Sequence, residues 1–102
     1  MKVIKFGGKA VASQTALNSL LSIIKHEAKQ QDIIIVVSAL DGITDALIDM
    51  SHLALNGDKK WSSNLEQLSL QHLRLAKEVL SEEDFHELSA NLKVMINVLK
   101  SI

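Results

Sequence analysis

Short apolar runs and longer amphipathic stretches alternate along the chain. Residues 1–6 contain Val3, Ile4 and Phe6 and predict a first strand. A second strand is predicted from Ile33 to Ser38, where an unbroken run of β-branched residues is typical of a parallel strand buried on both faces. Between them, apolar residues recur at intervals of three and four and predict a helix from Ser13 to about Gln30, with the inner face Ala16, Leu17, Leu20, Leu21, Ile24 and Ala28. Such a unit predicts parallel strands joined by a right-handed crossover.

Three further helices are expected in the second half of the chain. The first runs from about Thr44 to Leu55 and ends at Gly57, which suits a C-cap. The next runs from about Ser62 to Leu80. The sequence Ser81-Glu82-Glu83-Asp84 matches the capping-box pattern and predicts the start of the last helix. The expected inner face of the first of these helices contains Ile43, Leu47, Met50 and Ala54. That of the next contains Leu65, Leu68, Leu75, Ala76 and Val79. That of the last contains Phe85, Leu88, Leu92, Met95, Ile96 and Leu99.

The last helical pattern carries no stop signal, and two strands form a narrow sheet beside four helices. These features predict an α/β segment of a larger domain, with a β-α-β-α portion at 1–55 and a helical hairpin at 56–102. Apolar faces left open by such a segment attract another chain, so a homodimer or larger oligomer is expected, formed through the last two helices or at the sheet edge.

Composition narrows the classes of function. The 102 residues suffice for one domain at most. The net charge of −1 gives no bulk attraction to nucleic acid or to an anionic membrane. The absence of cysteine excludes disulfide, zinc-thiolate and thiol-nucleophile chemistry, and it fits a cytoplasmic protein. No apolar run approaches the roughly 20 residues that span a bilayer.

The end of the first strand suits phosphate binding. Lys5 lies two residues before Gly7 and Gly8, which permit positive φ and the close approach of a ligand. Turn amides can form an anion nest, and the helix opening at Ser13 adds partial positive charge. The pattern is neither a P-loop nor a dinucleotide fingerprint. Taken alone, it is better explained as a strand ending in a glycine turn, and Lys5 as a residue that faces solvent on an edge strand.

Hydroxyl and small residues follow the second strand. Ser38 ends the strand, Gly42 predicts a turn, and Thr44 opens the next helix. Because ligands of open α/β sheets bind at the carboxyl ends of strands, both loops are predicted to lie at the same sheet edge. On these grounds alone, Ser38 is also explained as a strand-end hydrogen-bonding residue and Thr44 as an N-cap.

Together the two motifs resemble the amino-terminal segment of the aspartokinases, in the amino acid kinase family. Those proteins begin with K-F-G-G-T-S and continue with V-V-S-A-x-x-G-x-T-[DN]. The corresponding residues here are Lys5-Phe6-Gly7-Gly8-Lys9-Ala10 and Val36-Val37-Ser38-Ala39-Leu40-Asp41-Gly42-Ile43-Thr44-Asp45. A weaker likeness to a later family helix is Gln71-His72-Leu73-Arg74-Leu75-Ala76. The resemblance implies a three-layer α/β/α parallel sheet, of which residues 1–102 form the first part of the catalytic domain.

The resemblance also implies a reaction. The γ-phosphoryl group of ATP passes to the β-carboxylate of L-aspartate with the help of Mg²⁺, giving 4-phospho-L-aspartate for lysine, threonine and methionine biosynthesis. Lys5 is then the catalytic cation, and Gly7, Gly8 and Lys9 join it in binding the ATP phosphates. Aspartate binding is assigned to Ser38 and Thr44. The family's adenine-binding half lies outside this segment, so the isolated chain is expected to be inactive.

Two positions depart from the family pattern. Lys9-Ala10 replaces Thr-Ser, and Asp41 stands where Gly or Ser is usual. Either Lys9 compensates electrostatically for the lost hydroxyls, or the site has drifted. Two alternative functions therefore stay open: a non-catalytic interaction module, and another amino acid kinase acting on a carboxylate or carbamate. A fusion to homoserine dehydrogenase is equally compatible with the sequence.

Other candidate residues carry weaker signals. The four histidines, His26, His52, His72 and His86, are dispersed, so no metal site is predicted. His72 falls on the apolar side of its helix and is interpreted as a hydrogen-bonded core residue. Lys59-Lys60-Trp61 pairs charge with an aromatic ring as nucleic-acid binders do. On a nearly neutral chain it is better explained as a solvated loop whose Trp61 anchors the following helix.

Overall fold

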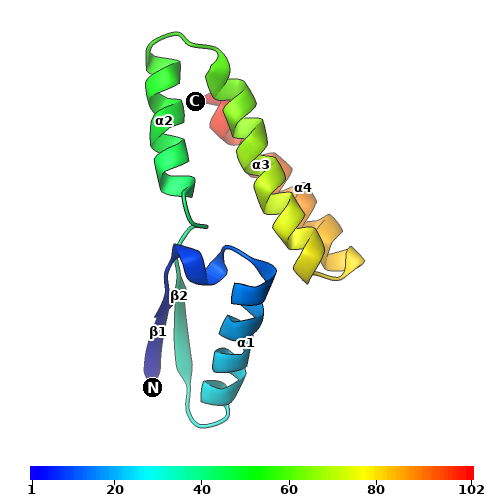
Figure 1. Ribbon diagram of the computed structural model, residues 1–102. Coiled ribbons are helices and arrows are strands. Elements are labelled where there is room, and N and C mark those ends of the chain that lie inside the picture. The colour runs from blue at the N-terminus through cyan, green and yellow to red at the C-terminus, as the bar shows by residue number, and fades with distance from the viewer. The chain divides into compact units, whose positions relative to one another are not determined.

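The computed structural model describes all of residues 1–102. The chain forms two compact units, Met1–Thr44 and Asp45–Ile102, and each is described by itself. Figure 1 shows the strands and first helix of one unit and the long helices of the other. The observed elements confirm an α/β chain with a two-stranded parallel sheet and four α-helices. None of the helices combines the length and apolar character needed to span a bilayer.

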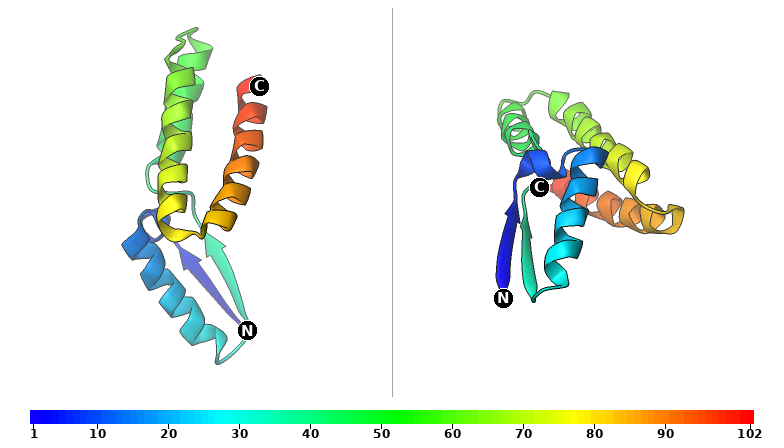
Figure 2. Two further views of the ribbon diagram at one scale, coloured as in Figure 1. Left: turned by 90° about the vertical axis from the view of Figure 1, so that its right-hand side faces the viewer. Right: turned by 60° about the horizontal axis from the view of Figure 1, so that its bottom comes forward.

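The first unit is a strand–helix–strand arrangement. Strands β1 (Lys2–Phe6) and β2 (Ile33–Val37) pair in parallel, with Lys2 opposite Ile33 and Phe6 opposite Val37. Helix α1 (Gln14–Ala28) connects them and lies on one side of the sheet (Figure 2). The hydroxyl of Ser13 caps α1 by accepting a hydrogen bond from the amide of Ala16 at 3.1 Å. The predicted parallel pairing is therefore confirmed.

The core of this unit lies between the sheet and α1. Phe6, Val11 and Leu20 are buried, and partly buried apolar residues pack around them: Ile4, Ala10, Leu17, Ile24 and Leu40. Val11 belongs to a short 3₁₀ helix, η1 (Gly8–Val11), which the hydrophobic pattern did not predict. This turn brings Ala10 and Val11 onto the core directly after β1.

The prediction that β2 is buried on both faces is wrong for this chain. Ile34, Ile35, Val36 and Val37 are 46%, 40%, 44% and 58% exposed. The unit supplies a helix on one face only, and side chains alternate between the two faces along a strand. The opposite face leaves Val3, Ile34 and Val36 in solvent, and α1 also leaves Ile35 and Val37 partly exposed on its own side of the sheet.

The second unit is helical and contains α2 (Ile43–Leu55, beginning at the end of the first unit), α3 (Lys60–Val79) and α4 (Glu82–Ser101). Gly57 has φ of +73° and ends α2, which confirms its C-cap role. Helix α3 begins two residues earlier than the prediction of about Ser62, because the carboxylate of Asp58 accepts a hydrogen bond from the amide of Lys60 at 3.0 Å. Trp61 thus lies within α3 rather than in a loop.

Helices α3 and α4 pack against each other. The hydroxyl of Ser81 accepts a hydrogen bond from the amide of Asp84 at 3.2 Å, so the expected cap of α4 is present. Leu65 is only 2% exposed and is the most deeply buried core residue, with Met50, Leu68 and Ala76 also buried. Helix α4, in contrast, contains no fully buried residue.

Candidate functional site

The two sequence motifs meet at one end of the small sheet. Because β1 and β2 are parallel, their carboxyl ends lie side by side. The amide of Ser38 donates to the carbonyl oxygen of Phe6 at 3.0 Å, and the amide of Asp41 donates to that of Gly8 at 3.1 Å. The structure therefore confirms that the Gly7–Gly8 loop and the loop from Ser38 to Thr44 share one sheet edge.

The two glycines of the first loop have different roles. Gly7 has φ of −75° and ψ of 177°, an extended conformation open to any residue. A Cβ atom on Gly8 would lie 3.1 Å from the carbonyl oxygen of Ala39 and 3.2 Å from the Cα of Asp41. The prediction of a positive-φ turn at the glycine pair is wrong, since positive φ occurs at Gly42 (+83°) instead. Gly8 is needed for the close approach of the two loops.

The start of η1 provides amides for an anion. In a 3₁₀ helix the first N–H groups have no intrahelical acceptor, and here the amide of Ala10 is the first to bond back, to Gly7 at 3.0 Å. The amides of Gly8 and Lys9 precede that bond, and no side chain caps them. The loop thus has the donors that a phosphate oxygen requires, although with a different backbone conformation from the predicted one.

Lys5 lies on β1 opposite Val36 of β2. Ile4 and Phe6 pack towards α1, so alternation places Lys5 on the uncovered face of the sheet. The neighbouring Lys2 is instead engaged with Glu27 of α1, at 3.1 Å between Nζ and Oε1. The structure gives Lys5 no ion pair, and its exposed ammonium is free to meet a ligand.

The hydroxyl residues assigned to aspartate are accessible. Ser38 and Thr44 are both exposed, and neither side chain takes part in a hydrogen bond within the chain. Helix α2 begins at Ile43, whose amide donates to the carbonyl oxygen of Leu40 at 3.1 Å, so Thr44 lies inside the first turn and is not the N-cap. The alternative of Thr44 as a capping residue is therefore wrong.

The positions that depart from the family pattern have distinct surroundings. Lys9 is exposed at the start of η1, beside the open amides. Ala10 packs against the buried cluster of Phe6, Val11 and Leu20, where a methyl group is better accommodated than a hydroxyl. The backbone of Asp41 binds Gly8, and its carboxylate is exposed. The local sequence motif did not predict that Ala10 packs against this cluster.

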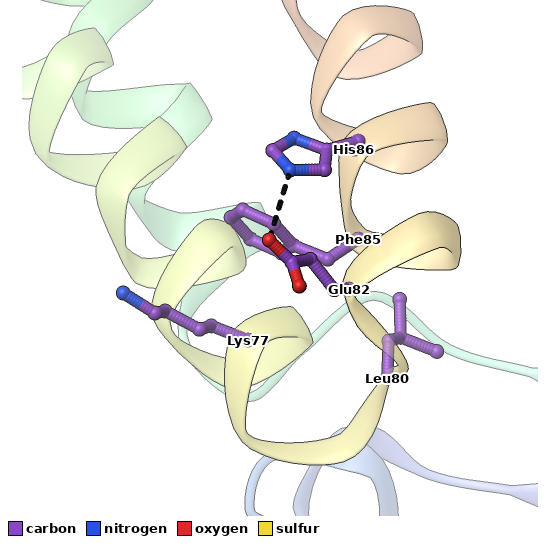
Figure 3. Close-up of a pocket in the computed structure, with 5 residues that line it drawn as sticks. All are labelled: Lys77, Leu80, Glu82, Phe85 and His86. Carbon is purple, nitrogen blue, oxygen red and sulfur yellow. Dashed lines mark ion pairs between the residues drawn. The ribbon is translucent and has the colours of Figure 1, made fainter.

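The helical unit has a separate depression of about 360 Å³, lined by Lys77, Leu80, Glu82, Phe85 and His86 (Figure 3). His86 and Glu82 face each other at 3.8 Å, and both are highly exposed.

Nowhere in residues 1–102 do three potential metal-ligating side chains come together. His72 is partly buried and its Nδ1 donates to the carbonyl oxygen of Leu68 at 2.8 Å, which confirms its interpretation as a hydrogen-bonded core residue.

Comparison with known proteins identifies one matching family and several similar proteins. The sequence profile described as the amino acid kinase family matches residues 1–98. The chain is 25% identical over 100 residues to a bifunctional aspartokinase/homoserine dehydrogenase 1 of Zea mays, covering 98% of this chain and 11% of that protein. It is 27% identical over 100 residues to the corresponding protein of Arabidopsis thaliana, with the same two coverages.

A shorter match is closer in sequence. The aspartokinase of Rickettsia prowazekii is 45% identical over 47 residues, covering 45% of this chain and 10% of that protein. The chain spans about a tenth of the length of the bifunctional relatives it matches. Since the profile covers nearly the whole chain, the chain belongs to the amino acid kinase family.

Proposed function

We propose that this chain is the amino-terminal part of an aspartate kinase catalytic domain, with residues 1–55 carrying the phosphate and aspartate motifs and residues 56–102 forming its helical hairpin. The observation that carries the proposal is the junction of the two motif loops, fixed by the Asp41–Gly8 hydrogen bond at the carboxyl edge of parallel strands. Ligands of open α/β sheets bind at this edge. Family membership and relatives named aspartokinase support the same assignment.

The phosphate end of the site consists of Lys5, Gly7, Gly8 and Lys9. The open amides at the start of η1 would bind phosphate oxygens of ATP, and the charge of Lys9 beside them would replace the family's hydroxyls. The ammonium of Lys5 would offset charge that develops on the transferring phosphoryl group. ATP would bind as its Mg²⁺ complex, in which the ion offsets the charge of the phosphates.

The acceptor end of the site consists of Ser38 and Thr44. Both side chains are exposed and uncommitted, so their hydroxyls can donate to the carboxylates of L-aspartate. The β-carboxylate attacks the γ-phosphoryl group directly, and the reaction needs no covalent intermediate with the protein. The uncovered sheet face around Val3, Ile34 and Val36 is where the remaining layers of a three-layer α/β/α domain would pack.

Acceptor specificity tests this proposal. In a hybrid enzyme, this chain replaces the segment that it matches over 100 residues in the bifunctional aspartokinase/homoserine dehydrogenase 1 of Arabidopsis thaliana, and ADP release is measured with aspartate, glutamate and carbamate as acceptors. We expect turnover with aspartate and little with the other two. Preference for glutamate or carbamate would assign the chain to another amino acid kinase. A folded hybrid without turnover on any acceptor would indicate that Lys9-Ala10 and Asp41 have ended catalysis.

A further inference from the structure

Asp41 places a carboxylate at the carboxyl edge of the small sheet. The first unit contains only two other acidic residues, and both lie elsewhere. Glu27 pairs with Lys2 of β1 at 3.1 Å, and Asp32 precedes β2, at the opposite end of that strand. The carboxylate of Asp41 is exposed and takes part in no hydrogen bond or ion pair within the chain. It is therefore a free anion at the edge where the two motif loops meet.

The backbone fixes the position of Asp41 between these loops. Asp41 and Gly42 are the central residues of a turn, in which the amide of Ile43 donates to the carbonyl oxygen of Leu40 at 3.1 Å. The φ of +83° at Gly42 belongs to this turn and favours glycine. The amide of Asp41 is bound to the carbonyl oxygen of Gly8 in the loop after β1. The amide is thus committed to the loop junction, whereas the side-chain carboxylate stays available to a ligand.

The acceptor assigned to this edge has three charged groups. L-aspartate carries two carboxylates and one α-ammonium group, and the exposed hydroxyls of Ser38 and Thr44 can donate to the carboxylates. An ammonium group has only donors, and a carboxylate accepts the stronger, charge-assisted kind of hydrogen bond from it. Asp41 lies midway between the two hydroxyl residues, three positions from each. The loop after β2 therefore offers a partner for each charged group of an amino acid.

The other charged residues near this edge are a poorer match for an ammonium group. Lys5 and Lys9 are exposed cations, which attract phosphate and carboxylate groups and repel a positive charge. Asp45 lies in the first turn of α2, where its negative charge interacts favourably with the helix dipole. Asp41 is outside the helix and unpaired, and it is therefore the better partner for a positive group.

We infer that Asp41 is a specificity-determining residue that accepts hydrogen bonds from the α-ammonium group of the acceptor, so that the site selects amino acids over simple dicarboxylates. The inference rests on the proposed function and names the residue that reads the amino group. A dicarboxylate such as succinate lacks the ammonium group, so the charge of Asp41 only repels it. Preference for aspartate over succinate then depends on the charge of one side chain.

A comparison of L-aspartate with succinate in the hybrid enzyme tests the inference. Succinate is aspartate without the amino group, so the ratio of kcat/KM for the two acceptors, measured by ADP release, isolates the ammonium contact. Asp41→Asn should lower this ratio by about tenfold to a hundredfold, the range expected for a hydrogen bond between charged groups. Asp41→Glu keeps the carboxylate and should retain most of the preference.

Two other acidic residues provide matched controls. Asp32→Asn removes the same charge at the far end of β2, and Asp45→Asn removes it in the first turn of α2. Both should leave the ratio nearly unchanged. A loss for Asp45→Asn as large as that for Asp41→Asn would assign the ammonium group to Asp45 and overturn the inference. An unchanged ratio for Asp41→Asn with an altered dependence on Mg²⁺ would make Asp41 a metal-binding residue and would overturn it too.

Binding without catalysis separates failure of this inference from failure of the kinase proposal. Isothermal titration calorimetry with the hybrid should show at least about tenfold tighter binding of L-aspartate than of succinate, and Asp41→Asn should remove the difference. Selective binding of aspartate without turnover would support the role of Asp41 and contradict the proposed catalysis. Equal affinities for the two acceptors in a hybrid that phosphorylates aspartate would overturn the inference alone. A folded hybrid that binds neither acceptor would overturn both.

Discussion

The backbone amide of Asp41 donates to the carbonyl oxygen of Gly8 at 3.1 Å, and this bond joins the loop after β1 to the loop after β2. The same contact explains why position 8 holds glycine. A Cβ there would lie 3.2 Å from both the amide nitrogen and the Cα of Asp41, which are backbone atoms that a rotamer change cannot move. Gly7, one residue earlier, has no atom within 4 Å of an added Cβ.

The two glycines should therefore respond differently to alanine. Gly8→Ala should lower the free energy of unfolding by about 1–3 kcal/mol, as overpacking does in well-packed regions. Gly7→Ala is the matched control and should change it by less than about 1 kcal/mol, because φ at Gly7 suits alanine. Urea unfolding followed by circular dichroism measures both. Equal losses in the two variants would show that the loops do not meet at Gly8.

The helical unit offers a similar comparison within α3. Leu65 is 2% exposed and Leu70 is 41% exposed. Leu65→Ala should cost about 2–5 kcal/mol, through lost burial and the cavity left behind. Leu70→Ala should cost well under 1 kcal/mol. The single Trp61 lies in the same helix, so its fluorescence during urea unfolding reports on this unit. Similar losses for the two variants would contradict the packing described.

Hydrophobic patterning predicted the two strands and the four α-helices, β2 from its run of β-branched residues and the helices from apolar residues at intervals of three and four. The pattern did not predict features that depend on single polar contacts or on tertiary packing, namely the exact start of a helix and the burial of a strand. Helix α3 begins at Lys60, where the backbone amide donates a hydrogen bond to the side-chain carboxylate of Asp58. The burial of β2 was overestimated. A run of β-branched residues indicates a strand, but it does not show how many elements of the chain pack against that strand.

The candidate site was predictable in position but not in backbone geometry. The parallel strands imply a shared edge for the two loops, as observed. The glycine pair suggested positive φ, yet the chain enters η1 with extended Gly7, and the close approach at Gly8 depends on residues 39 and 41 of a distant loop. The packing of Ala10 against the cluster of Phe6, Val11 and Leu20 likewise has no signal in the local sequence.

Aspartate recognition is tested at Thr44. In the hybrid kinase, Thr44→Val should raise KM for aspartate several-fold and leave KM for ATP nearly unchanged, because the exposed hydroxyl is assigned to the acceptor. Thr15→Val on the exposed side of α1 is a control that should alter neither value. Initial rates over a matrix of both substrate concentrations give the two constants. An equal rise in both would remove Thr44 from the acceptor site.

The 102-residue chain by itself should show no sustained aspartate kinase activity. It spans about a tenth of the length of its bifunctional relatives, and the phosphate and aspartate motifs provide no surface for the adenine base. A coupled assay of ADP release with aspartate, ATP and Mg²⁺ measures this, with the hybrid enzyme as positive control. Sustained turnover by the chain alone would show that residues 1–102 contain a complete active site.

The most direct measurement of the proposed function is the kcat of the hybrid enzyme with Lys5→Ala. The exposed ammonium of Lys5 is assigned to the developing charge of the phosphoryl group, so its loss should lower kcat by about a hundredfold or more. Lys2→Ala removes a cation of the same strand that pairs with Glu27 instead, and it should leave kcat within about twofold at the assay temperature. An unchanged kcat for Lys5→Ala, or equal losses in both variants, would contradict a catalytic Lys5 and reduce it to a strand residue.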